Sequence, residues 1–190
     1  MSKGALELTC EYVQNANLVS LRAWAAAAAF LGLAVSGCGS GKDSDAGSPQ
    51  KTVWDHFTVD VGGHSAELQV AVLPEEQDRG LMQRSDLGRN EGMIFVYPRP
   101  RRLSYWMHNT PEALDLGYLT ADGVIAEIYP LLPFDERPVQ SYSDQLKYAL
   151  EMPQGWFAAN GVHPGTRVDL KAVAAAMKAR GFDLAKFKLE

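Results

Sequence analysis

Two runs of alternating apolar and polar residues, joined by Gly62-Gly63, constrain the fold more than any other feature of the chain. The runs are HFTVDV and SAELQVAV, and such alternation is typical of strands that bury one face. Glycine readily adopts the positive φ angles that a two-residue hairpin turn requires. The stretch therefore predicts a β-hairpin in which Val61 lies opposite His64.

Further short β-rich runs follow at close intervals along the chain. Asp122-Gly123 predicts a second tight turn between two of these runs. Many short strands separated by tight turns are typical of a sheet whose strands are mainly antiparallel. We therefore predict a mainly β (α+β) fold, with a small antiparallel sheet that is strongly curled or closed into a barrel. The expected strands are MIFVY, RLSYWMH, LDLGYLT, VIAEIYPL, KYALEM and GTRVDL.

Three segments have the features of helices. PEEQDRGLM has Pro74 at a first helical position and Gly80 at its end, which predicts a short helix. PQGWFAANG, between Pro153 and Gly161, predicts another. The last segment predicts an amphipathic C-terminal helix, because its apolar residues recur at helical spacing. These residues are Leu170, Val173, Ala174 and Met177.

The front of the chain resembles a bacterial lipoprotein signal. Arg22 precedes the 13-residue apolar run AWAAAAAFLGLAV, which is short for a bilayer span and typical of a secretory signal. The following SGC resembles a lipobox, in which the peptide is cleaved before the cysteine and the thiol is acylated. The resemblance implies lipidation at Cys38 and a membrane partner held through that anchor. We therefore expect a location in the cell envelope, outside the cytoplasm, and Gly39 after the cysteine favours the outer membrane in a two-membrane cell.

The chain divides into four expected parts. Residues 1–37 are a leader and signal peptide, 38–52 a flexible Gly/Ser/Asp-rich tether, 53–170 the β-rich domain, and 171–190 a helical extension. The leader contains Glu7 and Glu11 upstream of Arg22, unlike a short basic signal start. We therefore expect translation to begin near Val19.

Composition excludes several functions for the β-rich domain. The net charge of −5 gives no indication of a nucleic-acid partner. The two cysteines, Cys10 and Cys38, precede this domain, which excludes a disulfide framework and a thiol nucleophile in it. The four histidines lack metal-ligand spacing, and no phosphate-binding glycine loop occurs. We therefore expect no metal and no cofactor.

A series of blocks resembles a known family. The blocks RGLMQRSDL, EGMIFVYP, YWMHNT with LDL after it, ADGVIAEI, YALEMPQGW and NGVHPGTRV occur in this order. They resemble domain of unknown function 192 over about 68–168. The resemblance implies a small, barrel-like β domain in an often exported protein, and it brings no established reaction or catalytic residue. The chain departs from the family pattern at His108, usually another basic residue, and at Ala113, usually proline.

The stretch YWMHNTPEALDL gathers polar and aromatic residues and contains most of the candidate site residues. If 103–110 is a strand, Tyr105 and Met107 share one face, and Trp106 and His108 share the other. Asp115, like Glu127 and Glu151, lies in an otherwise apolar strand, where an unpaired buried carboxylate is costly. One interpretation is a structural ion pair of Asp115 with Arg79 or Arg102. The other is a polar cluster at one mouth of the barrel that forms a candidate site for a small polar ligand, made by Arg79, Trp106, His108, Asn109 and Asp115.

The function that the sequence favours is a lipid-anchored envelope protein whose β-rich domain is a binding or accessory module. No recognisable catalytic motif occurs, which favours a protein that is not an enzyme. The first alternative is an envelope hydrolase that uses Asp115 or Glu127 as base beside His108. The second is a structural assembly factor of the envelope, for which an exposed apolar patch is the expected sign.

Overall fold

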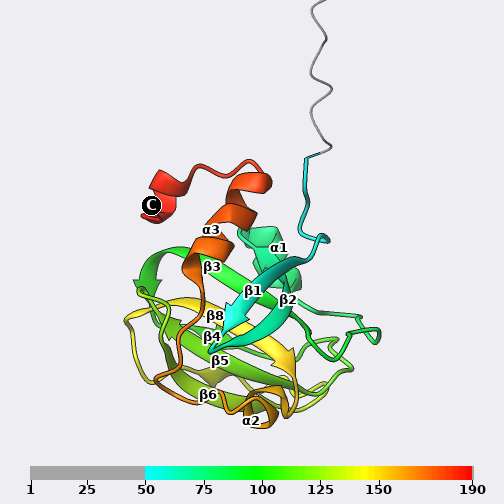
Figure 1. Cartoon of the computed structure of the whole chain (residues 1–190). Coiled ribbons are helices and arrows are strands. Elements are labelled where there is room, and N and C mark those ends of the chain that lie inside the picture. Colours follow the sequence, from blue (N-terminus) through cyan, green and yellow to red (C-terminus); the bar gives the residue numbers. More distant parts are fainter. Residues whose placement is uncertain (1–49, 190) are drawn as a thin grey trace, which may run out of the picture. The chain divides into compact units, whose positions relative to one another are not determined.

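The computed structural model describes residues 50–189, which form a mainly β domain with two sheets and three α-helices (Figure 1). The predicted fold class is confirmed. The leader, the signal peptide and Cys38 lie outside the described residues. The large sheet has the strand order β1-β2-β3-β8-β5-β6, and β4 and β7 form the small one. The strands are β1 Phe57–Val61, β2 His64–Ala71, β3 Glu91–Arg101, β4 Ser104–Tyr105, β5 Leu114–Thr120, β6 Ile125–Leu131, β7 Val139–Gln140 and β8 Leu146–Pro153.

Both predicted hairpins are present. In β1–β2, Val61 pairs with His64, and the turn glycines have φ angles of 66° and 90°. In β5–β6 the chain reverses at Asp122-Gly123, and Gly123 has a φ of 79°. The positive φ at these positions is the reason why glycine marks both turns in the sequence.

The large sheet is mainly antiparallel, as predicted, but one parallel pair makes it mixed. Strands β2 and β3 run parallel, and the other neighbouring pairs of the sheet are antiparallel. Parallel strands cannot be joined by a tight turn and need a crossover. Helix α1, Pro74–Arg79, and the loop after it form this crossover. The helix begins at Pro74 and is capped by Gly80, as predicted.

The sheet does not close into a barrel, which was the second form that we predicted for it. Its edge strands are β1 and β6, and they do not pair with each other. The segment 166–168 forms isolated bridges instead, Val61 with Val168 and Val124 with Arg167. The expected strand GTRVDL is therefore only a pair of bridges. The expected strand RLSYWMH is also short, because β4 ends at Tyr105.

Apolar side chains pack on both faces of the large sheet. One core contains the buried side of α3 and alternate residues of β8, including Tyr148 and Leu150. The other core contains Phe95, Tyr118 and Ala149. Because side chains alternate along a strand, Glu151 points to the same side as Ala149. The helices beyond α1 are α2 Trp156–Ala159 and α3 Leu170–Ala179, followed by the 3₁₀ turn η1 Leu184–Phe187.

The C-terminal helix has the predicted buried face. Val173, Ala174 and Met177 are buried, and Leu170 packs against the same core at its edge. Asp169 caps the first turn, because its carboxylate accepts hydrogen bonds from the backbone N–H groups of Lys171 and Ala172. Within 50–189, none of the helices has the length and apolar character to cross a bilayer.

Candidate functional site

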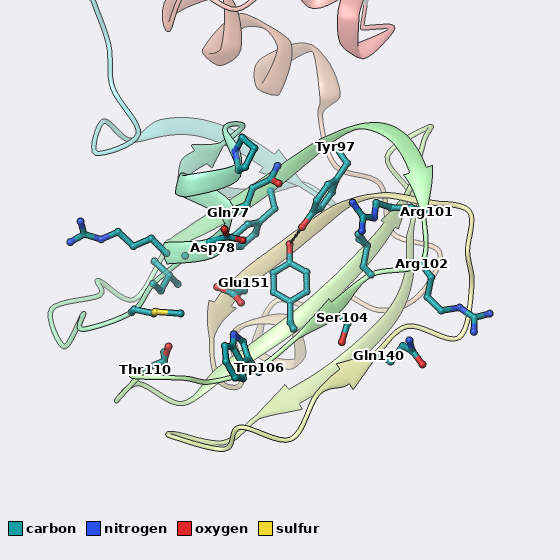
Figure 2. A pocket seen from close by; sticks show the side chains of 18 residues that line it. Gln77, Asp78, Tyr97, Arg101, Arg102, Ser104, Trp106, Thr110, Gln140 and Glu151 are labelled. Atoms are coloured by element: carbon teal, nitrogen blue, oxygen red, sulfur yellow. Dashed lines mark hydrogen bonds between the residues drawn. The ribbon is translucent and has the colours of Figure 1, made fainter.

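A cavity of about 700 Å³ lies beside the second core, between α1, β3 and the short strand β4 (Figure 2). Pockets that hold small molecules commonly have volumes of roughly 300–1,000 Å³. The cavity is open to solvent and has polar and apolar groups on its walls. Its size and lining suit a small ligand that presents both kinds of surface.

Aromatic side chains form one wall of this cavity. The rings of Phe95 and Tyr105 meet edge to face with centroids 4.9 Å apart. The hydroxyl groups of Tyr97 and Tyr105 share a hydrogen bond of 2.9 Å, which Figure 2 shows as a dashed line. Trp106 is half exposed at the rim. Burial raises the pKa of Tyr105 well above its ordinary value, so this phenol stays protonated.

The carboxyl group of Glu151 lies at the floor of the cavity. It belongs to β8, a central strand, and is paired across the sheet with Met93 on β3 and Leu116 on β5. Its side chain points into the space between Asp78 and Trp106 (Figure 2). The residue is only 4% exposed. An ionisable carboxyl group therefore lies between two apolar side chains of the neighbouring strands, Met93 and Leu116.

Glu151 has no hydrogen-bond or ion-pair partner among residues 50–189. Burial alone raises the pKa of its carboxyl group from 4.5 to about 8. A buried carboxyl that lacks a partner is unusual, because desolvation of the charge is costly unless another group compensates it. A strongly raised pKa in a cavity is typical of a functional site.

The arginines that line the cavity contact other groups. Arg79 lies over the ring of Trp54 at 4.6 Å from its centroid. Arg101 lies over the ring of Tyr97 at 5.6 Å. Arg102 donates a hydrogen bond of 3.2 Å to the backbone carbonyl of Tyr142. None of the three compensates Glu151.

The structure separates the five residues that we proposed as a ligand cluster. Arg79 and Trp106 line the cavity, whereas His108, Asn109 and Asp115 do not. The His108 ring stacks on Trp106 with centroids 5.0 Å apart, and its Nδ1 lies 2.6 Å from Oε1 of Glu136. Asn109 has a φ of 51°, and its Nδ2 lies 2.9 Å from Nε2 of His108. This group shapes the loop beside the cavity.

Asp115 has a local structural role. Its Oδ2 accepts a hydrogen bond of 2.7 Å from the backbone N–H of Gly155, in the turn before α2. The ion pair that we considered with Arg79 or Arg102 does not occur in the described part of the chain. No hydrogen bond or ion pair there joins Asp115 to His108 either, so the acid–base pair of the hydrolase alternative is not assembled.

Glu127, the other carboxylate of that alternative, is fully bonded. It accepts hydrogen bonds from the backbone N–H groups of Tyr142 and Ser143, at 2.9 and 2.8 Å, and from the Tyr129 hydroxyl at 2.7 Å. Burial alone would raise the pKa of Glu127, but these donors outweigh it and lower the pKa. Glu127 therefore holds the loop at 142–143 against β6.

Glu151 is not among the five site residues that we predicted from the sequence. The signal was present, since Glu151 is the acidic residue of the apolar run YALEM. We grouped it with Asp115 and Glu127, which have the same kind of sequence environment. Only the fold distinguishes the three: it places backbone donors at Asp115 and Glu127 and a cavity at Glu151.

Metal ligation has no support in the described residues. No group of three or more His, Cys, Asp or Glu side chains is placed there so that it could hold an ion. The acidic groups that line the cavity are Glu151 and Asp78, and the phenol groups of Tyr97 and Tyr105 also line it.

The fold and the cavity define a class of protein: a small, mainly β domain with a ligand-sized cavity on one face of an open, mixed sheet. Residues 57–170 match the model of the DUF192 family, described as "Uncharacterized ACR", and the chain belongs to this family. A search of curated proteins finds no match.

Two solved structures are similar to the chain. One is described as a candidate transcription regulator from Sinorhizobium meliloti, with 28% identity, a TM-score of 0.58, and coverage of 63% of this chain and 96% of that one. The other is a protein of unknown function from Novosphingobium aromaticivorans, with 33% identity, a TM-score of 0.57, and coverage of 60% and 84%.

Proposed function

We propose that the chain is a lipid-anchored protein of the cell envelope whose β-rich domain binds a small molecule in the cavity above Glu151. One observation carries the binding function: a buried carboxyl group without a partner lies at the floor of an aromatic-walled, ligand-sized cavity. An apolar residue would fit better between Met93 and Leu116. The carboxyl group therefore weakens the fold at a site where it can contact a ligand.

A thermal-shift screen tests the binding function. The whole chain carries Cys38→Ala so that no acyl group is added, and it is compared with the same chain carrying Glu151→Gln. A ligand that binds the folded state raises the melting temperature, because occupancy stabilises that state alone. We expect compounds that stabilise the first protein and stabilise the Glu151→Gln protein much less. A screen in which every stabilising compound acts equally on both proteins contradicts the proposal.

The envelope anchor has its own test. The supporting observations are the apolar run after Arg22 and the SGC that ends at Cys38. We expect the wild-type chain to incorporate a labelled fatty acid in cells and the Cys38→Ala chain to incorporate none, because the thiol that would be acylated is missing. Equal incorporation of the label by the two chains contradicts lipidation at Cys38.

The same carboxyl group favours an enzyme as the second candidate. A carboxyl group with a pKa of about 8 remains largely protonated near neutral pH and can serve as a general acid. Asp78, which lines the same cavity, can serve as the second carboxylate. Turnover of aryl ester or glycoside substrates that is lost in Glu151→Gln and unaffected by His108→Ala supports this function.

A further inference from the structure

We infer that the cavity selects an organic cation, a quaternary ammonium or protonated amine, whose charge lies against Glu151 and whose alkyl groups pack on the aromatic wall. The inference rests on the proposed binding function and narrows its ligand class. Three observations support it. Glu151 has no partner among the described residues, the polar groups around it bond to other groups, and aromatic rings line the same cavity.

The neighbouring phenol groups do not bond to Glu151. The Tyr97 and Tyr105 hydroxyls share one hydrogen bond with each other, and the Tyr118 hydroxyl donates to the backbone carbonyl of Val139. The carboxylate therefore has no hydrogen bond from the described residues that surround it. A bound cation supplies both the opposite charge and the contact that a buried carboxylate requires.

Of the charged groups that line the cavity, the three arginines contact other groups, and the two carboxyl groups bond to no other described residue. Asp78 is a second carboxylate without a hydrogen bond or ion pair to other described residues. Arg101 lies over the ring of Tyr97, and Arg102 donates a hydrogen bond to the backbone carbonyl of Tyr142. Neither guanidinium group therefore occupies the space above Glu151. The carboxyl groups thus remain available to a ligand.

The aromatic wall suits the same ligand class. Ring faces attract cations, and the contribution is larger where water is excluded. Arg101 over the Tyr97 ring shows this interaction at the rim already. Tyr105 and Trp106 also line the cavity and offer further ring surface.

The pH dependence of binding distinguishes a cation from a neutral ligand. A cation requires ionised Glu151. Below about pH 8, binding of the cation therefore releases the proton of Glu151, and the affinity for the cation increases as pH rises to that value. A neutral ligand that accepts a hydrogen bond from protonated Glu151 has the opposite dependence. The Tyr97, Tyr105 and Tyr118 phenols stay neutral, because burial raises the pKa of each. The other ionisable groups facing the cavity are Asp78, Arg79, Arg101 and Arg102.

The test compares two probes of the same shape, choline and its neutral carbon isostere 3,3-dimethylbutan-1-ol. Each is titrated by calorimetry and NMR into the whole chain with Cys38→Ala, at pH 6, 7, 8 and 9. Benzyltrimethylammonium is added as a larger cation. At pH 8 we expect choline to bind at least about tenfold more tightly than the alcohol, by analogy with desolvated cation–aromatic contacts. Choline affinity should weaken by nearly tenfold per pH unit from about pH 7 to pH 6, and change little above pH 8.

Matched variants localise the effect. Glu151→Gln should remove both the preference for choline and the pH dependence, whereas Glu75→Gln, on the exposed side of α1, should change neither. Trp106→Ala should weaken choline binding by about threefold or more. Trp54→Ala is its control, since Trp54 is 47% exposed, Trp106 is 49% exposed, and only Trp106 lines the cavity.

The outcomes separate the two proposals. If the alcohol binds as tightly as choline and Glu151→Gln weakens both, the cation inference is wrong and the binding function stands. Failure of both cations to bind also overturns the inference. If, in addition, the thermal-shift screen finds no compound that depends on Glu151, the binding function is overturned as well.

Discussion

Two carboxyl groups, Glu76 on α1 and Glu151 on β8, have opposite surroundings. At the junction of α1 and α3, Glu76 accepts hydrogen bonds from the backbone N–H groups of Val72 and Leu73, at 2.9 and 3.0 Å, and is paired with the guanidinium group of Arg180. Burial alone would raise the pKa of Glu76, but these partners lower it. At the cavity floor, Glu151 has no such partners and its pKa is raised.

The difference shows that this fold supplies hydrogen-bond donors and an opposite charge to a carboxylate that links two of its elements. Glu76 ties α1 to α3 through Arg180, which also donates to the carbonyl of Val70. Glu151 links no elements of the fold through its side chain, because no other described residue bonds to its carboxyl group. The comparison therefore separates a charge that holds the fold together from one that is available to a ligand.

The largest expected effect is the pH dependence of stability due to Glu151. Between pH 4.5 and about 8 the folded chain retains a proton that the unfolded chain has released. Stability is therefore highest below this window and falls as pH rises through it, by roughly 5 kcal/mol at most, at about 1.4 kcal/mol per pKa unit. Urea unfolding of wild type and Glu151→Gln from pH 4 to 9 measures the difference. Parallel stability curves for the two proteins contradict a raised pKa.

Breaking the compensated pair should have the next largest effect. Glu76→Gln leaves Arg180, which is only 7% exposed, without its carboxylate. We expect a loss of about 3 kcal/mol in the free energy of unfolding at pH 7. Glu75→Gln, one position earlier and exposed, is the control and should change stability by less than about 0.5 kcal/mol. Similar effects of the two substitutions contradict a structural role for the pair.

Substitution of Glu127 should have an effect on stability between those of Glu76 and Asp115. Glu127→Ala removes the acceptor for the N–H groups of Tyr142 and Ser143, which water can partly replace because this region is less buried. We expect a loss of about 1–2 kcal/mol at pH 7. The contribution is present above the pKa that Glu127 has in the unfolded chain and decreases as pH falls through its lowered folded pKa. This pH dependence is opposite in sign to that of Glu151. If the loss of stability caused by Glu127→Ala grows as pH falls, the lowered pKa of Glu127 is contradicted.

The smallest expected effect is at Asp115. Asp115→Ala removes one hydrogen bond to the N–H of Gly155, and we expect a loss of about 0.5–1 kcal/mol in the free energy of unfolding. Binding of choline should be unaffected, because Asp115 does not line the cavity. Loss of binding in a folded Asp115→Ala protein would show that the site extends beyond the cavity described here.

The parts of the fold that the sequence predicted are those fixed by local geometry. Gly62-Gly63 and Asp122-Gly123 define their hairpins through turn chemistry alone. The parallel pairing of β2 with β3 depends on how the chain crosses over after α1, and no local residue pattern specifies it. The shortness of β4 has the same origin, since its partner β7 lies far along the chain and pairs through two residues only.

The site was harder to predict than the fold. Asp115, Glu127 and Glu151 all lie in apolar strands, and the sequence cannot tell which acid meets a backbone donor. Gly155 supplies the donor for Asp115, and the 142–143 loop supplies donors for Glu127. For Glu151 the facing surface is a cavity, and a cavity is formed by elements that are remote in the sequence.

The bridges made by segment 166–168 also affect the order in which the protein folds. Val168 pairs with Val61, so the end of the first strand is secured by residues that are synthesised more than 100 positions later. Contacts of such long sequence separation slow folding, because a large loop must close before they form. During synthesis, the ends of β1 and of the β5–β6 hairpin stay without these partners until the last part of the domain has emerged. A chain truncated before Thr166 should therefore expose both ends and aggregate more readily than the complete one.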